Sequence, residues 1–108
     1  EISLQRLIMW MMRSLGLKKS DMLRAVFHKK FRKYYRKLKR NEKQRVNERI
    51  HLFYRDPFNP ILENHALHGT YAGCRSINIT GDLRAVYEDM SDGIVQFIAF
   101  GTHPELYG

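Results

Sequence analysis

The chain has 108 residues, of which 44% are hydrophobic and 28% are charged. This length and composition predict one soluble globular domain with a modest core and argue against a disordered chain. The single cysteine, Cys74, excludes an internal disulfide and any metal site built from several cysteines. The longest apolar run, Leu7–Met12, is far shorter than the ~20 residues that a membrane span needs. We therefore expect a cytoplasmic protein without a membrane partner.

The positive charge is concentrated in the first part of the sequence. The formal net charge is +8, but residues 1–63 contain 17 basic and 6 acidic residues, whereas residues 64–108 contain 2 basic and 5 acidic residues. The range Lys29–Arg45 contains ten basic residues and one acidic residue, Glu42. Such a concentrated positive surface commonly faces a polyanion, most often nucleic acid. The alternatives are a solvated helix face and a surface that binds an acidic protein.

The first quarter of the chain combines a helical and an extended pattern. Apolar residues recur at helical spacing over residues 2–15, which predicts a helix that ends near Gly16. Residues that favour extended structure then predict a short strand over Leu23–His28.

Two further helices are predicted in and after the basic segment. In the first of them the apolar residues recur at intervals of three and four, and they are Phe31, Tyr34, Tyr35 and Leu38. The basic residues consequently occupy the remaining face of that helix. Asn41 is expected to be the N-cap of the next helix. That helix ends at Asp56–Pro60, because neither proline of this segment can continue it.

The second half of the chain predicts three antiparallel strands. Side chains alternate over Cys74–Thr80, which favours a half-buried strand. The turn sequences Gly81-Asp82 and Ser91-Asp92-Gly93 then introduce strands over Leu83–Glu88 and Ile94–Phe100. The order of elements predicts an α+β domain in which two helices pack on one small antiparallel β-sheet, with an extra N-terminal helix.

Residues that can transfer protons lie near the ends of these strands. His65 and His68 precede the first strand of the second half, Asp82 lies in a turn, and His103 follows the last strand. Antiparallel strands can bring such positions to one end of a sheet. Metal-free RNA cleavage needs a base for the 2′-hydroxyl, an acid for the 5′-oxygen and cations for the phosphate. Each histidine is also consistent with a solvated or stabilising loop residue, and Asp82 with a simple turn residue.

Three segments resemble the YafQ-type branch of the RelE/ParE toxin superfamily in both sequence and spacing. They are Asn64–Arg75 (NHALHGTYAGCR), Asp82–Tyr87 and Gly101–Gly108 (GTHPELYG). The resemblance extends over residues 22–108, so that residues 1–21 are expected to form a helical extension of a RelE-like domain. It implies a toxin of a type II toxin–antitoxin system that cleaves mRNA on the ribosome, without a metal or another cofactor. The partners that it implies are the ribosome, mRNA and a cognate antitoxin.

The resemblance also assigns roles to individual residues. It implies that His65 is a general base or phosphate contact and that His103 is the general acid. Asp82 and Tyr107 complete the catalytic set, with Tyr107 positioning or stacking on a base. The residues expected to bind RNA are Lys30, Lys33, Lys37, Arg75, Asn78 and Arg84. The two arginines are equally suited to ion pairs with nearby acidic residues.

Two residues depart from the family pattern. Asn78 stands where the family has a second histidine, and it can form hydrogen bonds but cannot transfer a proton. Leu83 replaces an aromatic residue and cannot stack on a base. Two alternatives therefore stay open: a ParE-like inhibitor of DNA gyrase, and a catalytically degenerate member that binds RNA or the antitoxin. The three groups His65, Asp82 and His103 argue against the gyrase inhibitor.

Overall fold

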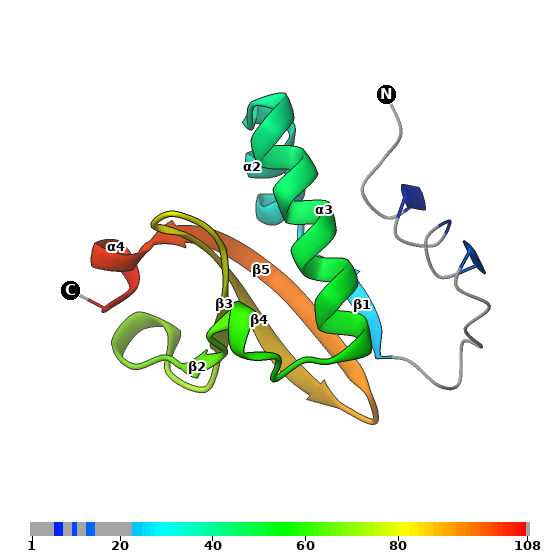
Figure 1. Cartoon of the computed structure of the whole chain (residues 1–108). Coiled ribbons are helices and arrows are strands. Elements are labelled where there is room, and N and C mark those ends of the chain that lie inside the picture. The colour runs from blue at the N-terminus through cyan, green and yellow to red at the C-terminus, as the bar shows by residue number, and fades with distance from the viewer. Residues whose placement is uncertain (1–5, 8–9, 11–12, 15–22, 108) are drawn as a thin grey trace.

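A computed structural model describes residues 6–7, 10, 13–14 and 23–107 of the chain (Figure 1). Its elements are β1 (Arg24–Phe27), α2 (Lys29–Lys37), α3 (Arg40–Arg55), the 3₁₀-helix η2 (Pro60–Leu62), β2 (His65–Ala66), the 3₁₀-helix η3 (Gly69–Tyr71), β3 (Arg75–Thr80), β4 (Leu83–Ser91), β5 (Ile94–Thr102) and α4 (His103–Tyr107). The helix predicted over residues 2–15 lies mostly outside the described residues. In the part of the chain that the structure describes, no helix is long and apolar enough to cross a membrane.

The five strands form one sheet in the order β1-β5-β4-β3-β2. The predicted meander is confirmed, because β4 pairs antiparallel with both β3 and β5. The sheet is nevertheless mixed, because β1 pairs in parallel with β5. The long connection through α2 and α3 permits this pairing, which a tight turn would not allow. The two-residue strand β2, which the sequence did not predict, pairs with the outer edge of β3.

The two long helices begin where side chains satisfy their first backbone N–H groups. At the start of α2, Nδ1 of His28 accepts a hydrogen bond of 3.1 Å from the backbone N–H of Lys30. The prediction that Asn41 caps α3 is wrong, because the N-cap is Lys39. The Glu42 carboxylate accepts a hydrogen bond of 3.0 Å from the backbone N–H of Lys39, and this contact fixes the start of the helix two residues earlier.

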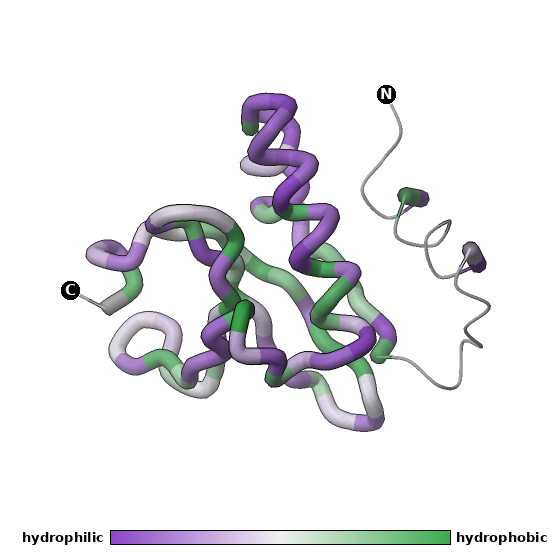
Figure 2. The backbone as a smooth tube through the Cα atoms, viewed as in Figure 1, coloured by the Kyte–Doolittle hydropathy of each residue, from purple (hydrophilic) through white to green (hydrophobic). Residues whose placement is uncertain are grey.

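The main core lies between the helices and one face of the sheet. It contains buried residues of both α2 and α3 together with those of four strands. At its centre the ring of Phe97 is fully buried and lies 5.5–5.7 Å from the rings of Phe27, Phe31, Phe53 and Tyr87. Figure 2 shows hydrophilic residues along much of both helices and hydrophobic residues in the strands beneath them.

A smaller core covers part of the opposite face of the sheet. Its buried members are Leu67, Cys74, Val86 and Leu106. On β4 the neighbours of Val86 belong to the main core, and alternation along a strand places Val86 on the other face. Burial, and to a smaller extent the charge of Glu88, raises the pKa of the Cys74 thiol. The segment that carries η3 and the helix α4 therefore packs on the face that the long helices leave open.

The aromatic cluster predicts that replacing a buried phenylalanine lowers the free energy of unfolding much more than replacing an exposed one. We expect Phe97→Ala to lower the free energy of unfolding by about 3–5 kcal/mol, because it leaves a cavity among four rings. The matched control is Phe58→Ala, since the Phe58 side chain is 66% exposed. Its expected cost is below about 1 kcal/mol. Urea denaturation measures both, and similar losses in the two variants would contradict this description of the core.

Candidate active site

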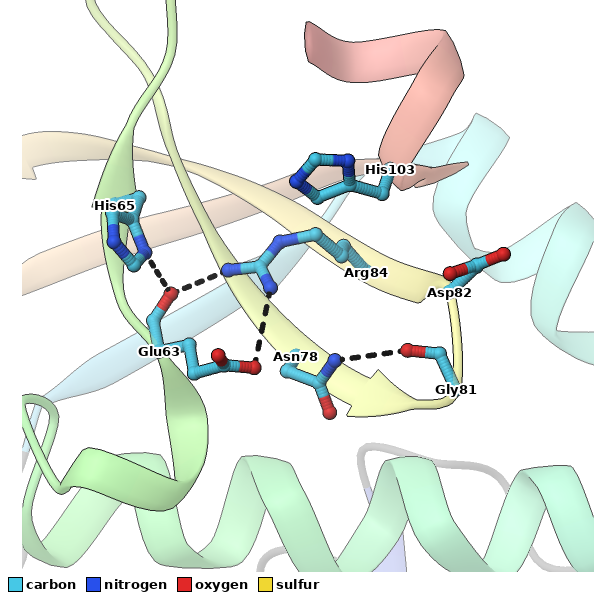
Figure 3. Close-up of a pocket in the computed structure, with 7 residues that line it drawn as sticks. All are labelled: Glu63, His65, Asn78, Gly81, Asp82, Arg84 and His103. Carbon is cyan, nitrogen blue, oxygen red and sulfur yellow. Dashed lines mark hydrogen bonds and ion pairs between the residues drawn. The ribbon is translucent and has the colours of Figure 1, made fainter.

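A pocket of about 360 Å³ lies at one end of the sheet, on the face that carries the smaller core. Its lining residues are Glu63, His65, Asn78, Gly81, Asp82, Arg84 and His103 (Figure 3). The pocket brings together three of the four residues predicted to be catalytic and two of those predicted to bind RNA.

Strand pairing explains why distant residues meet there. β2 pairs with β3 so that His65 lies opposite Ser76, and Asn78 follows two residues later on the same face. β4 pairs with β5 so that the residues after Asp82 and before His103 lie opposite each other. The backbone N–H of His103 accordingly donates a hydrogen bond of 3.0 Å to the carbonyl oxygen of Asp82.

Arg84 supplies a buried positive charge to the pocket, with only 4% of the residue exposed. Its Nε donates a hydrogen bond of 2.7 Å to the hydroxyl of Ser76, and a terminal nitrogen donates to the Ser76 carbonyl oxygen at 3.2 Å. The same nitrogen donates to the carbonyl oxygen of Glu63, whose carboxylate lies 4.0 Å from the other terminal nitrogen. Figure 3 shows the guanidinium between the rings of His65 and His103. A cation fixed in this way is preorganised to bind an anion.

The Glu63 carbonyl oxygen also determines which ring nitrogen of His65 carries the hydrogen. Nδ1 of His65 lies 2.6 Å from that oxygen. A carbonyl oxygen only accepts hydrogen bonds, so Nδ1 carries the hydrogen and Nε2 of the neutral ring is the proton acceptor. Glu63 has φ 45° and ψ 53°, a left-handed conformation that is uncommon outside glycine. This turn of the backbone directs one carbonyl oxygen toward both His65 and Arg84.

His103 is held at the first residue of α4 by a capping box. The backbone N–H of Thr102 donates to the Glu105 carboxylate at 2.7 Å, and the backbone N–H of Glu105 donates to the Thr102 hydroxyl at 3.4 Å. The preceding Gly101 allows α4 to pack closely, because a Cβ there would lie 2.8 Å from Cδ2 of Leu106. Four positions of the GTHPEL sequence therefore have a structural role, namely Gly101, Thr102, Glu105 and Leu106.

Other predicted site residues lie outside the pocket. Nε of Arg75 donates a hydrogen bond of 2.7 Å to Oδ1 of Asn64, and its guanidinium lies 5.3 Å from the ring centroid of Phe58. Tyr107 ends α4, and its side chain lies outside the described part of the structure. The exposed face of α2 carries Lys30, Lys33 and Lys37, none of which lines the pocket.

Asn78, Leu83 and Glu63 differ in how far the sequence predicted their place in the site region. Asn78, which was predicted to bind RNA, lines the pocket, and its Nδ2 donates a hydrogen bond of 3.2 Å to the Gly81 carbonyl oxygen. Leu83 is buried in the main core, so this side chain contributes to packing. Glu63 was missed, because no periodicity or turn pattern marks a left-handed glutamate. Among the described residues, no group of three or more His, Cys, Asp or Glu is placed to hold a metal ion.

Comparison with known proteins assigns the family. A family model described as the bacterial toxin of type II toxin–antitoxin systems, YafQ, matches residues 23–108. The chain belongs to the YafQ family. It is therefore a toxin of the type II toxin–antitoxin class. No curated protein matches the sequence significantly.

Solved structures of toxins share the fold. The YoeB/ParE toxin from Agrobacterium tumefaciens is 24% identical with a TM-score of 0.63, over 75% of this chain and 99% of that chain. YafQ from E. coli is 20% identical with a TM-score of 0.55, over 78% of this chain and 97% of that chain. YafQ in the E. coli DinJ–YafQ toxin–antitoxin complex is 20% identical with a TM-score of 0.53, over 78% and 96% of the two chains. The predicted RelE-like α+β fold is confirmed.

The capping box at His103 predicts a pH-dependent contact. Hydrogen bonds from the backbone and then the side chain of Thr102 lower the pKa of the Glu105 carboxyl. Because the charged form is favoured in the folded state, the contact is complete above the ordinary pKa of glutamate and is lost as the pH falls through the lowered value. The amide NMR signal of Thr102 should titrate with this lowered midpoint. The transition should vanish in Glu105→Gln, and a midpoint at or above the ordinary value would contradict the capping box.

Proposed function

We propose that this YafQ-family toxin is a ribosome-dependent mRNA endonuclease, an mRNA interferase that acts by metal-free acid–base chemistry. The observation that supports it is the pocket in which two imidazoles from distant elements lie on either side of the buried guanidinium of Arg84. Two proton-transfer groups and a fixed cation are what cleavage of an RNA phosphodiester requires.

In the proposed reaction, Nε2 of His65 accepts the proton of a 2′-hydroxyl. The resulting 2′-oxygen attacks the adjacent phosphorus, and the guanidinium of Arg84 stabilises the negative charge that accumulates on the phosphoryl oxygens. His103 donates a proton to the departing 5′-oxygen. The P–O5′ bond breaks, and the products are a 2′,3′-cyclic phosphate and a 5′-hydroxyl.

The other predicted catalytic residues have supporting roles in this proposal. Asp82 borders the pocket with an exposed side chain, and its carbonyl oxygen accepts the hydrogen bond from the backbone of His103. We assign its carboxylate to orienting the His103 imidazole. Tyr107, one helical turn after His103, is assigned to positioning or stacking on a base of the mRNA. Asn78 is assigned to hydrogen bonding with the RNA.

The exposed lysines of α2 are proposed to bind ribosomal RNA. Helix α2 buries Phe31 and Tyr35 in the main core and exposes its basic residues. Such a surface binds phosphates in a salt-dependent way and reads little sequence. A cognate antitoxin is the second proposed partner, and the cytoplasm is the proposed site of action. We assign residues 22–108 to the toxin domain and residues 1–21 to an extension.

Removing either imidazole of the pocket should abolish most of the cleavage. We expect His65→Ala and His103→Ala to slow cleavage of ribosome-bound mRNA by about 10²–10⁴-fold, the usual contribution of a general acid or base. His68→Ala is the matched control, because His68 is exposed and does not line the pocket. Primer extension on mRNA and growth arrest after induction measure the effect.

The same experiment separates the alternatives. Undiminished growth arrest with His103→Ala would contradict the catalytic role of that residue. A wild-type protein that binds ribosomes or antitoxin and leaves mRNA intact would be a degenerate member. Inhibition of supercoiling by purified DNA gyrase would instead indicate a ParE-like activity.

Neutralising the lysines of α2 should weaken ribosome binding and leave the fold intact. The variant Lys30→Gln/Lys33→Gln/Lys37→Gln should bind ribosomes less tightly and with a flatter salt dependence, because each lost phosphate contact reduces the slope by about one. The melting temperature should change little, since all three side chains are exposed. The triple Lys→Arg variant is the control. A large loss of stability with unchanged binding would contradict this assignment.

A further inference from the structure

The side-chain amide of Asn64 joins three parts of the chain beside the pocket. Its Nδ2 donates hydrogen bonds of 2.8 Å to the hydroxyl of Tyr87 on β4 and of 2.9 Å to the carbonyl oxygen of Pro57 after α3. Its Oδ1 accepts the hydrogen bond of 2.7 Å from Nε of Arg75 on β3. A terminal nitrogen of Arg75 also donates to the backbone carbonyl oxygen of Asn64 at 3.4 Å. Both donors and the acceptor of this amide are therefore used.

This network holds the residues that arrange the pocket. Asn64 lies between Glu63, whose carbonyl oxygen contacts the side chains of His65 and Arg84, and His65 itself. The left-handed conformation of Glu63 costs free energy and persists only when the surrounding structure fixes it. The amide of Asn64 is bonded to three separate segments and is placed to supply that restraint.

We propose that Asn64, bonded to Arg75 and Tyr87, is a positioning residue that directs the Glu63 carbonyl and thereby keeps the hydrogen of His65 on Nδ1. The proposal rests on the proposed function, because it assigns Nε2 of His65 to proton transfer. It also assigns Arg75, which was predicted to hold phosphate, to orienting His65, the proposed general base.

The surroundings of Arg75 support this assignment. Its guanidinium lies over the ring of Phe58 and bonds to both the side chain and the backbone of Asn64. The other partner, Tyr87, is only 4% exposed, and burial raises the pKa of its phenol, so that the hydroxyl is neutral. A neutral hydroxyl and a planar guanidinium hold the Asn64 amide in one orientation.

The decisive variants replace Asn64 by residues with the same number and branching of side-chain heavy atoms. Asn64→Leu removes all three side-chain hydrogen bonds and should lower kcat for cleavage by about 10-fold or more, with KM changed less than about 2-fold, because a misplaced base slows chemistry more than binding. Asn64→Asp keeps an acceptor for Arg75 and for the Tyr87 hydroxyl but loses the hydrogen bond to the Pro57 carbonyl oxygen, so it should lower kcat less than Asn64→Leu does. Where Asn64→Leu fails to fold, Tyr87→Phe removes one of these hydrogen bonds and should lower kcat to a smaller extent.

Substitutions of Arg75 separate positioning from phosphate binding. Arg75→Lys keeps the positive charge but loses the two directed hydrogen bonds to Asn64, so we expect it to lower kcat as Arg75→Gln does. Arg55→Lys is the matched control, because Arg55 is exposed and lies outside the site. Wild-type activity in Arg75→Lys, together with a raised KM in Arg75→Gln, would show a phosphate contact and overturn the proposal.

A second measurement tests the proposal without any nuclease activity. Long-range ¹H–¹⁵N spectra identify which ring nitrogen of His65 carries the hydrogen, with the signals assigned from their loss in His65→Gln. We expect Nδ1–H in the wild type and in Asn64→Asp, and a mixture of tautomers in Asn64→Leu. A wild-type protein that cleaves no mRNA would contradict the proposed function, while the tautomer would still test the positioning role. An unchanged His65 tautomer in every folded variant would overturn the inference.

Discussion

The site depends on one buried cation, the guanidinium of Arg84. It joins β4 to the hydroxyl and the carbonyl oxygen of Ser76 on β3 and to the carbonyl oxygen of Glu63 before β2. A buried charge is costly unless hydrogen bonds surround it, so each of these segments has to be placed around the side chain. The guanidinium lines the pocket together with His65 and His103 (Figure 3). The same contacts that make burial of the charge possible therefore also organise the residues of the candidate site.

The alternation of side chains along the strands divides the molecule into two surfaces. One face of β3 and β4 carries Ile77, Ile79 and Ala85, which pack under the basic helices. The other face carries Ser76 and Arg84, which belong to the pocket region. The basic helices α2 and α3 and the pocket residues Asn78 and Arg84 consequently lie on opposite faces of the sheet. The proposed binding to ribosomal RNA and the proposed cleavage therefore involve different surfaces.

Much of the fold follows from local patterns in the sequence. The alternation at Ile77 and Ile79 predicted β3, and the spacing of Phe31 and Tyr35 predicted the buried side of α2, because both patterns report which face is buried. The parallel pairing of β1 and the two-residue strand β2 were not predicted. These features depend on contacts between distant segments, which no local pattern records.

The candidate site was predictable in part for a similar reason. His65, Asp82 and His103 were found because their residue types suit proton transfer, and the resemblance gave their spacing. Glu63 contributes mainly a backbone carbonyl oxygen, and any residue type can supply that group. Arg75 was assigned to phosphate from its charge, whereas its hydrogen bonds to Asn64 are visible only in the folded structure.

The parallel pairing of β1 with β5 has a consequence for how the chain folds. Arg24 pairs with Ile94, so that α2, α3 and the strands β2, β3 and β4 lie within the loop that this pairing closes. Contacts between residues so far apart in sequence carry a large loop-closure entropy and slow the folding of small domains. The local hairpins of β3, β4 and β5 can form first, and β1 then completes the sheet. Until it does, the outer edge of β5 exposes unpaired backbone groups, which makes this edge the position most open to pairing with another chain.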